Sequence, residues 1–381
     1  MELFVYDKQL NPIGIIDEVI SCIWTPTYWE GGTFQDCKIL APVTSNNTLM
    51  LEVGNLVVLK GERADFVDEG GEWRRAFEIT YKHIQTNAEG MEQIEVQGCF
   101  LKKWLNKRVI SAVEQINDTN QNIINYLVRK NCGDNAEIPR RFQNFQILSQ
   151  DNFQGEVVDF STEYGQYLGD IVAERSALSK LGFDILVNER EKKYGFWLYK
   201  GLDLSGNNAQ GNSPCIFSRD YDNVSTQEYT DCIESDKNVA YSISAVDDNG
   251  NTFSVEVLEE GELIGIDRKE EYVNNTSISW KTDDKVLSQS EYIALMQKSC
   301  VDSLEEDSQV TNFTSVIDTS ANLKYKEDFR VGDIVTSIEK RWNIRIDARI
   351  TKISQAWQNG KSSIEITFGD SLPTLLDKLR K

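Results

Sequence analysis

Few residues of this chain have the types and spacing that catalysis requires. His83 is the only histidine among the 381 residues, so a Ser-His-Asp triad would have to be built on it. It lies within a predicted strand, no GxSxG nucleophile motif accompanies it, and HExxH, a Walker loop and GxGxxG are all absent from the sequence. We therefore predict that the chain is not an enzyme, has no catalytic, cofactor-binding or metal-binding residues, and needs no cofactor.

Acidic residues are too numerous for composition to exclude a carboxylate pair, which a glycosidase needs only about 5 to 10 Å apart. The richest runs are EVLEEGELIGIDRKEE (256–271) and SLEED (303–307), and both lack the alternating spacing of a calcium loop. The stretch Asp247-Asp248-Asn249-Gly250 resembles part of such a loop, but hairpin turn chemistry already explains it. We expect solvated surface here, and a cell-wall or polysaccharide-degrading enzyme stays open as an alternative.

An aromatic cluster offers a different kind of site. The stretch WTPTYWEGGTF, residues 24–34, places Trp24, Tyr28, Trp29 and Phe34 around a Gly-Gly turn. Such side chains stack on sugar rings or pack against other protein surfaces. We expect packing, at a barrel corner or a subunit contact, and keep a glycan-binding module as a second alternative.

The overall charge narrows the classes of partner. Lys and Arg number 40 against 61 Asp and Glu, a formal charge of −21, which repels phosphate backbones and anionic lipid headgroups. No apolar run of 18 residues occurs, and MELFVYDKQLN alternates like a strand and does not open a signal peptide. We predict no sequence-specific nucleic-acid binding and no stable membrane insertion. The seven cysteines are odd in number and contain no CxxC pair, so we expect reduced, mostly buried thiols.

A repeat is the strongest architectural signal. VGNLV (53–57) and VGDIV (331–335) are each followed by a strand, a glycine turn, an Ile-Glu-Val or Ile-Glu-Ile strand, a second glycine and an amphipathic helix. The matched positions are Ile84 and Ile353, Gly90 and Gly360, Ile94 and Ile364, and Gly98 and Gly369. The two glycines are 8 residues apart in the first copy and 9 in the second, a difference that one β-bulge would absorb.

Alternation along each copy predicts one core face and one wet face. Ile364, Ile366 and Phe368 would face the core, while the residues between them face away. The closing helices would cover the barrel ends, with Phe100, Leu101, Trp104 and Leu105 in one copy and Leu372, Leu375, Leu376 and Leu379 in the other. We predict an α+β, mainly β fold: two related small β-barrel domains with an α/β insertion and a helical segment.

The expected domains are 1–110 for the first barrel, 111–205 for the α/β insertion, 215–257 with 310–381 for the second barrel, and 258–309 for a helical or irregular insertion. Apolar stripes predict two helices in the α/β insertion. The first has Asp118 or Thr119 as its cap and Gly133 as its stop, and the second has a stripe running from Tyr164 and ends at Gly182. A hairpin spanning 239–257 would supply the first strands of the second barrel. Ser288 and Glu291 have capping-box spacing ahead of another helix.

Three stretches, taken in order, carry a family resemblance: GNLVVLKG with IEVQGCFLKKWLNKR, then CIFSRDYDNVSTQEYTDCIESDKNVAYSISA, and finally YKEDFRVGDIVTSIEK through IEITFGDSLPTLLDK. In these the chain resembles the tail-tip hub proteins of tailed phages and prophages. That group is similar to the central baseplate hub of contractile tails and to the N-terminal part of the tail-associated protein of long non-contractile tails. The resemblance implies a homotrimer whose six barrels form a ring, adapting the sixfold tail tube to a threefold tip.

The same resemblance implies partners and a location. The partners would be the tail tube, distal tail proteins, and tip or fibre proteins, at the virion tail tip after synthesis in the bacterial host cytoplasm. An acidic chain would suit a channel through which DNA slides, because like charges repel. Many relatives carry a further peptidase, lectin-like or fibre-forming domain, whereas only Asp370 to Lys381 follow the last strand here. We therefore expect a hub alone or a piece of a longer protein.

Overall fold

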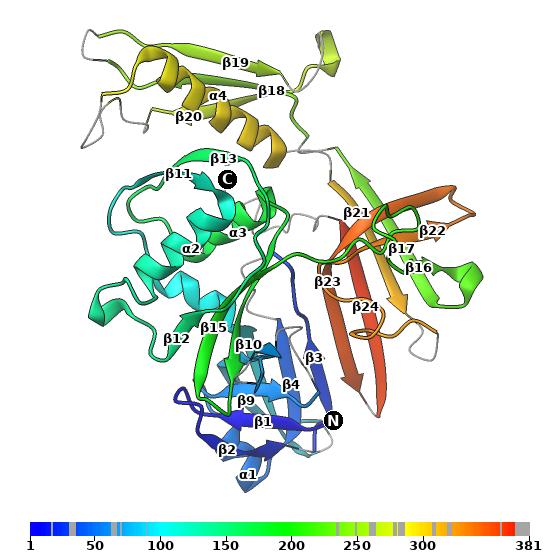
Figure 1. Cartoon of the computed structure of the whole chain (residues 1–381). Coiled ribbons are helices and arrows are strands. Elements are labelled where there is room, and N and C mark those ends of the chain that lie inside the picture. The colour runs from blue at the N-terminus through cyan, green and yellow to red at the C-terminus, as the bar shows by residue number, and fades with distance from the viewer. Residues whose placement is uncertain are drawn as a thin grey trace. The chain divides into compact units, whose positions relative to one another are not determined.

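The computed structural model describes residues 1–16, 18–29, 36–61, 67–68, 71–88, 90–233, 236–247, 250–258, 264–276, 280, 286–306, 310–317, 322–358 and 360–369. The chain divides into two compact units, one formed by 1–227 with 314–368 and the other by 228–313 with 369–381 (Figure 1). Each unit is described by itself.

The first barrel lies in the larger unit and is antiparallel. Its strands are β1 (Leu3–Tyr6), β2 (Pro12–Ile16), β3 (Ser21–Trp24), β4 (Cys37–Pro42), β5 (Leu56–Leu59), β9 (Phe77–Thr86) and β10 (Glu92–Phe100). They are hydrogen-bonded in the order β3-β4-β10-β9-β5-β1-β2. The short helix α1 (Ser45–Met50) and the two-residue strands β6 (Val67–Asp68), β7 (Gly71–Glu72) and β8 (Arg74–Arg75) lie between the longer strands in sequence.

Alternating side chains build the core of this barrel. Along β4 the residues alternate between buried and half-buried, as the period of two in a strand requires. The buried set also includes Trp24 from β3 and Ile94 and Val96 from β10, and all three are fully buried. The ring of Trp24 contacts two phenylalanines edge to face, with centroids 5.6 Å from Phe77 and 5.2 Å from Phe100.

The second copy of the barrel sheet lies mostly in the same unit, and its strands β17 and β21 run across the boundary to the smaller unit. Its strands are β16 (Ile216–Ser218), β17 (Val224–Cys232), β21 (Val310–Ile317), β22 (Ile334–Glu339), β23 (Ile344–Gln358) and β24 (Lys361–Gly369), and the 3-10 helix η3 (Arg219–Tyr221) precedes β17. The sheet order is β17-β21-β24-β23, with β22 paired to β23. Ile366 and Phe368 are fully buried, Thr367 between them is half-buried, and Glu365 on the other side of Ile366 is exposed. The predicted alternation is therefore confirmed for these residues.

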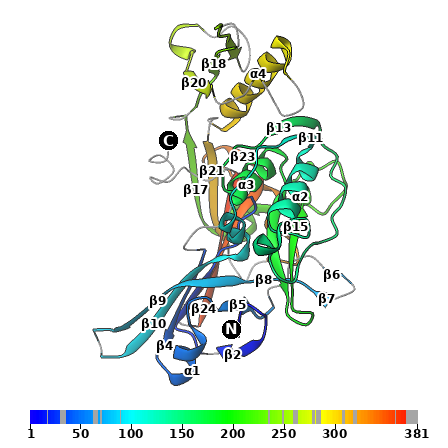
Figure 2. The same cartoon turned by 90° about the vertical axis from the view of Figure 1, so that its left-hand side faces the viewer.

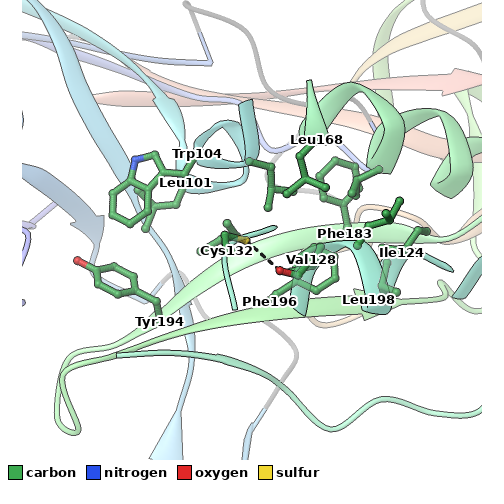
Figure 3. Close-up of a cluster of buried hydrophobic side chains, with 14 of the residues drawn as sticks. Leu101, Trp104, Ile124, Val128, Cys132, Leu168, Phe183, Tyr194, Phe196 and Leu198 are labelled. Atoms are coloured by element: carbon green, nitrogen blue, oxygen red, sulfur yellow. Dashed lines mark hydrogen bonds between the residues drawn. The ribbon is translucent and has the colours of Figure 1, made fainter. Parts of the chain in front are cut away.

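The α/β insertion packs on the first barrel through a shared apolar core (Figure 3). Its elements are β11 (Gln115–Thr119), α2 (Asn120–Asn131), η2 (Ile138–Arg140), β12 (Phe145–Ile147), β13 (Val157–Ser161), α3 (Leu168–Leu178), β14 (Gly182–Asn188) and β15 (Lys193–Tyr199). Val128 of α2, Leu168 of α3 and Phe196 of β15 meet Leu101 from the end of the barrel, and all four are fully buried. The sheet order is β12-β15-β14-β8, so a barrel strand joins the insertion's sheet.

Helix boundaries agree with the predictions in one case and differ in another. The α2 helix is capped by Thr119, whose side chain accepts from Asn122 N, as predicted. The α3 helix begins only at Leu168 and ends at Leu178, so the predicted start near Tyr164 was wrong. Tyr164 is 76% exposed, and Lys180 takes a left-handed φ of 56° that ends the helix before Gly182.

The smaller unit corrects the predicted second barrel. The hairpin of β18 (Val239–Ser244) and β19 (Ser254–Leu258) forms as predicted, but its third partner is β20 (Glu270–Asn275), which pairs with β18 in parallel. These strands make a separate three-stranded sheet. The hairpin therefore does not belong to the second barrel, because its apolar face is buried by the helix α4 (Gln289–Glu306). The 3-10 helix η4 (Gly265–Asp267) precedes β20.

The predicted capping box opens α4. Ser288 N donates to the Glu291 carboxylate at 2.8 Å, and Glu291 N donates to Ser288 Oγ at 3.3 Å. Tyr292 of this helix stacks on Trp280 with ring centroids 3.8 Å apart. Together with Met296, Cys300 and Leu304 it covers the sheet.

Of the two predicted closing helices, one is described. It is the 3-10 helix η1 (Leu101–Lys107), which buries Leu101, Trp104 and Leu105. The other, at Leu372 to Leu379, lies outside the described residues. Among the helices that the structure describes, none has the length and apolar character needed to cross a membrane. The predicted boundary between 1–110 and 111–205 stays a prediction, since both segments lie in one compact unit.

Candidate functional site

The sequence candidates for chemistry do not converge in the structure. His83 lies exposed on β9, with its ring 6.3 Å from the Tyr81 ring. It faces Glu95 across the ladder. In the part of the chain that the structure describes, no group of three or more His, Cys, Asp or Glu could hold a metal ion.

The two acidic runs lie in different places. Residues 256–271 contribute to ion pairs around Arg268, and residues 303–306 belong to α4. Arg268 forms ion pairs with Glu256 and Glu270, the latter at 2.6 Å from Nε. Ser303 of α4 donates to Glu271 at 3.2 Å. Asp247 accepts at its backbone oxygen from Gly250 N at 3.0 Å, which closes a turn. Residues 248, 249, 259–263 and 307 lie outside the described residues. The described carboxylates of these runs thus form ion pairs, a side-chain hydrogen bond and a turn.

Six cysteines are buried and free: Cys22, Cys37, Cys99, Cys132, Cys215 and Cys300. Burial raises the pKa of Cys22, Cys132 and Cys215 to about 12 and that of Cys99 to about 11. The side chain of Cys232 lies outside the described residues. A thiol with so high a pKa carries almost no thiolate near neutral pH.

We predict that these six thiols react with a disulfide reagent at pH 8 only after unfolding. The physical reason is that both steric access and thiolate formation are suppressed by burial. Counting released chromophore with and without denaturant measures the effect, with Cys232 allowed to react in either state. Rapid reaction of more than one thiol per folded chain would contradict the prediction.

The aromatic stretch at residues 24–34 packs, so the prediction of packing is confirmed for its described part and the sugar-platform alternative is wrong for Trp24. The Trp24 and Tyr28 side chains are fully buried. Trp29 is half-buried, its ring 5.2 Å from Tyr28. Phe34 lies outside the described residues. A ring buried in a barrel core has no face to offer a sugar.

The ladder confirms the repeat and corrects its register. In the first copy the pairing steps from Gln97↔Tyr81 to Gly98↔Ile79, so Thr80 is the bulged residue. In the second copy it steps from Thr367↔Lys352 to Phe368↔Ile350, so Thr351 bulges. Both hairpins therefore carry one bulge at the same place.

The position of the bulge in each hairpin shows which residues of the two copies are equivalent. Ile94 corresponds to Ile364, and their partners Ile84 and Gln355 correspond as well. The predicted equivalence of Ile84 with Ile353 was wrong by two residues, which leaves the face unchanged. Gly98 corresponds to Phe368 and not to Gly369, so the difference in glycine spacing is not a bulge present in one copy alone.

The equivalence extends to five strands. The first copy has sheet order β3-β4-β10-β9-β5, and the second has β17-β21-β24-β23-β22. In each copy the five strands also follow the same order along the chain. In the second copy, β18 to β20 and α4 lie between β17 and β21 in sequence. The duplicated element is thus a five-stranded unit.

The two copies are joined edge to edge within one chain. β3 pairs antiparallel with the outer half of β23, from Gln355↔Trp24 to Gln358↔Ser21. The pairing continues irregularly, because Ile353 N donates to Pro26 O at 3.2 Å and Tyr28 N donates to Thr351 O at 2.8 Å. We call this contact the joint. Through it the two five-stranded units form one continuous sheet.

Tyr28 connects the joint to the α/β insertion through hydrogen bonds of its hydroxyl group. Its hydroxyl lies 3.1 Å from Lys180 O and 3.2 Å from Tyr199 O, and accepts from Gly201 N at 3.2 Å. Burial raises the pKa of this hydroxyl. The Arg349 guanidinium lies 5.2 Å from the ring centroid. Tyr28 therefore contacts the insertion and both barrel copies.

Glycines make room for this packing. A Cβ on Gly182 or Gly332 would lie 2.2 or 2.3 Å from the Tyr28 ring. A Cβ on Gly201 would lie 1.9 Å from Gly332 O, a backbone atom that cannot turn aside. The backbone next to Tyr28 is also held by a buried lysine: Lys102, 1% exposed, donates to Thr27 O at 2.7 Å.

The open face of the continuous sheet is polar and nearly balanced in charge. We define it as the residues of β3, β4, β10, β24 and the outer parts of β9 (81–86) and β23 (352–358) on the side away from the barrel cores. Its charged residues are Lys38, Lys352, Lys361, Glu95 and Glu365. Lys38 and Glu95 pair at 2.9 Å. The acidic residues that give the chain its net charge are therefore not concentrated on this face.

A cavity of about 180 Å³ lies at the end of the joint, between residues 19–20 and the β23-β24 turn. Its lining residues include Trp357 and Lys361. None of its lining residues carries a carboxylate side chain. It therefore offers no pair of acids for glycoside hydrolysis.

Solved structures share this fold. The chain matches the prophage tail protein gp18 from Listeria monocytogenes with TM-score 0.52 and 13% identity, covering 100% of this chain and 98% of that one. A tail protein from Neisseria meningitidis matches with TM-score 0.57 and 10% identity, over 97% and 96% of the two chains. The 43 kDa tail protein of prophage MuSo2 from Shewanella oneidensis matches with TM-score 0.53 and 10% identity, over 97% and 98%.

Sequence comparison places the chain in a family. No curated protein matches it significantly. The model of the family described as Siphovirus ReqiPepy6 Gp37-like protein matches residues 2–370, nearly the whole chain, and the structural neighbours above are phage tail proteins of the same fold. The chain therefore belongs to the Siphovirus ReqiPepy6 Gp37-like family.

Proposed function

We propose that this protein is a structural component of a phage or prophage tail tip, in which three copies form a hub ring. The observation that carries the proposal is the joint, because it shows two equivalent five-stranded units of one chain continuing one sheet edge to edge. Three chains joined in the same way would present six similar units, the arrangement that matches a sixfold tube to a threefold tip.

In this ring the open face would line the channel, since the opposite face is buried in the barrel cores. Its uncharged hydroxyl and amide groups, with few and balanced charges, would let DNA pass without sequence-specific contacts. The tail tube and distal tail proteins would bind one side of the ring, and tip or fibre proteins the other. The location is then the virion tail tip, after synthesis in the host cytoplasm.

The proposed role is structural and not catalytic. It is supported by the burial of Trp24 and Tyr28, the exposed position of His83 on β9 and the lack of a carboxylate lining the cavity at the joint. We propose no cofactor and no metal.

We predict that the purified protein has three times the mass of the 43.5 kDa chain in light scattering across a concentration series. Electron microscopy of the same sample should show a ring of six similar lobes around a channel. Addition of the cognate tail tube protein controls for assembly that waits for a template. A monomer under both conditions would overturn the hub proposal.

A further inference from the structure

One half of β9 has an unoccupied edge within the described residues. β5 pairs with β9 only at Phe77 and Glu78, and the backbone of Ile79 bonds to Gly54 and Asn55. Beyond the bulge at Thr80, the named strands of the sheet pair with β9 only from the β10 side. Figure 2 shows β9 and β10 as a long hairpin. An open strand edge is a template for pairing with another chain.

The hydrogen-bond pattern identifies which groups point out of this edge. Asn87 N donates to Met91 O across the turn, while Glu92 O accepts from Val43 N on the other side of β10. Because backbone groups alternate along an antiparallel ladder, His83 and Gln85 bond to β10. The N–H and C=O groups of Lys82, Ile84 and Thr86 point away from it.

The equivalent edge in the second copy is occupied. Lys82, Ile84 and Thr86 correspond to Ile353, Gln355 and Trp357. At the joint β3 pairs with Gln355 and Trp357, and Pro26, just after β3, accepts from Ile353 N. The exposed fractions of the two equivalent residues differ accordingly: Gln355 is 7% exposed, whereas Ile84 is 47% exposed. The apolar Ile84 is thus left uncovered where its counterpart is covered.

The strand that would cover it is also present in the chain, at the far end of the sheet. β17 corresponds to β3, and it is the last strand of the sheet order, paired only with β21 in the described sheet. Within the described residues, one chain therefore has one occupied joint, one β9 edge without a partner strand along 82–86, and one β17 edge without a second partner strand. The two open edges are the two halves of a second joint.

We infer that β17 of a second copy of this chain pairs antiparallel with residues 82–86 of β9, repeating between subunits the joint that β3 and β23 make within one chain. The inference rests on the proposed ring and specifies its subunit contact. It follows from the duplication, because each five-stranded copy has one edge at its first strand (β3 or β17) and another at the outer half of its long strand (β9 or β23). Within one chain only the edges of β3 and β23 are paired with each other.

A proline at position 84 tests this contact. Ile84 N–H points away from β10, so Ile84→Pro removes no bond of the hairpin, and proline is accepted on a strand edge that faces solvent. The same ring blocks a strand from pairing at that edge. Ile84→Thr is the matched control, since threonine keeps the N–H and the strand preference. Circular dichroism and thermal melting should show that both variants fold.

The expected result is that wild type and Ile84→Thr form trimers, whereas Ile84→Pro associates at least roughly tenfold more weakly. A folded Ile84→Pro variant that trimerises like wild type would overturn the edge contact and leave the hub proposal standing. A wild-type protein that stays monomeric with and without tube protein would overturn the hub proposal itself. The two failures are therefore distinguishable.

Residue-resolved hydrogen exchange on the wild-type protein needs no mutation and covers the case in which Ile84→Pro misfolds. The amides of Lys82, Ile84 and Thr86 should be protected in the trimer and exchange quickly in the diluted monomer. Those of His83 and Gln85 should be protected in both, because they bond to β10. Equally fast exchange of the first three amides in the trimer would overturn the inference.

Discussion

Replacing Tyr28 by alanine is expected to lower the free energy of unfolding of the larger unit by about 4 kcal/mol. Removing a large buried aromatic side chain typically costs about 3 to 5 kcal/mol, and Tyr28 is fully buried where the insertion and both barrel copies meet. Denaturant unfolding followed by fluorescence measures the change. Tyr28→Phe should cost less, about 1 to 3 kcal/mol, since it removes only the hydroxyl's hydrogen bonds.

Tyr164→Ala is the matched control, because Tyr164 is 76% exposed and its loss should change stability by less than about 0.5 kcal/mol. Comparing the two tyrosines thus separates the effect of burial on stability from the effect of replacing a tyrosine by alanine. If Tyr28→Ala destabilised the protein no more than Tyr164→Ala, the central role of Tyr28 at the joint would be disproved.

Replacing Arg75 by methionine is expected to cost about 3 to 5 kcal/mol. Arg75 and Asp184 are 5% and 1% exposed, and Arg75 Nε donates to Asp184 Oδ2 at 2.6 Å. Arg75 belongs to β8 of the barrel segment and Asp184 to β14 of the insertion. Removing one member of a buried ion pair leaves the other charge buried without compensation.

A double variant distinguishes this pair from simple packing. Arg75→Met combined with Asp184→Leu should recover much of the loss, because no isolated charge then remains buried. Lys60→Met is the surface control: Lys60 pairs with Glu2 at 2.6 Å, with side chains 55% and 40% exposed, and such pairs contribute at most about 1 kcal/mol. Equal losses at Arg75 and Lys60, measured by denaturant unfolding, would refute the argument.

Several elements could be predicted because their signals are local. The glycine turns at Gly90 and Gly360, the hairpin of β18 and β19, and the capping box at Ser288 all depend on residues within a few positions of one another. The duplication was visible because its two copies share these local signals in the same order. Ile84 and Ile353 were nevertheless matched two residues out of register, since the period of two fixes the face and not the partner.

The predictions that failed depended on distant contacts. The hairpin at 239–257 has the same alternation whether it joins a barrel or packs on α4, and only the position of that helix decided between them. Packing of the aromatic stretch at 24–34 was predicted correctly for Trp24 and Tyr28, but the sequence did not show which residues they pack against. What decided it was that Lys180, Tyr199 and Gly201 come to the hydroxyl of Tyr28 from more than a hundred residues away.

By itself the sequence determined that this is a mainly β chain with a duplicated hairpin unit and turns, caps and core faces in definite places, because periodicity and capping act over a few residues. Only the tertiary structure decided which strand edges are joined and which stay open. An edge is occupied only if a strand elsewhere in the chain reaches it, and β3 reaches β23 whereas no named strand of the described sheet reaches the outer half of β9. That difference depends on long-range geometry, which no local pattern records.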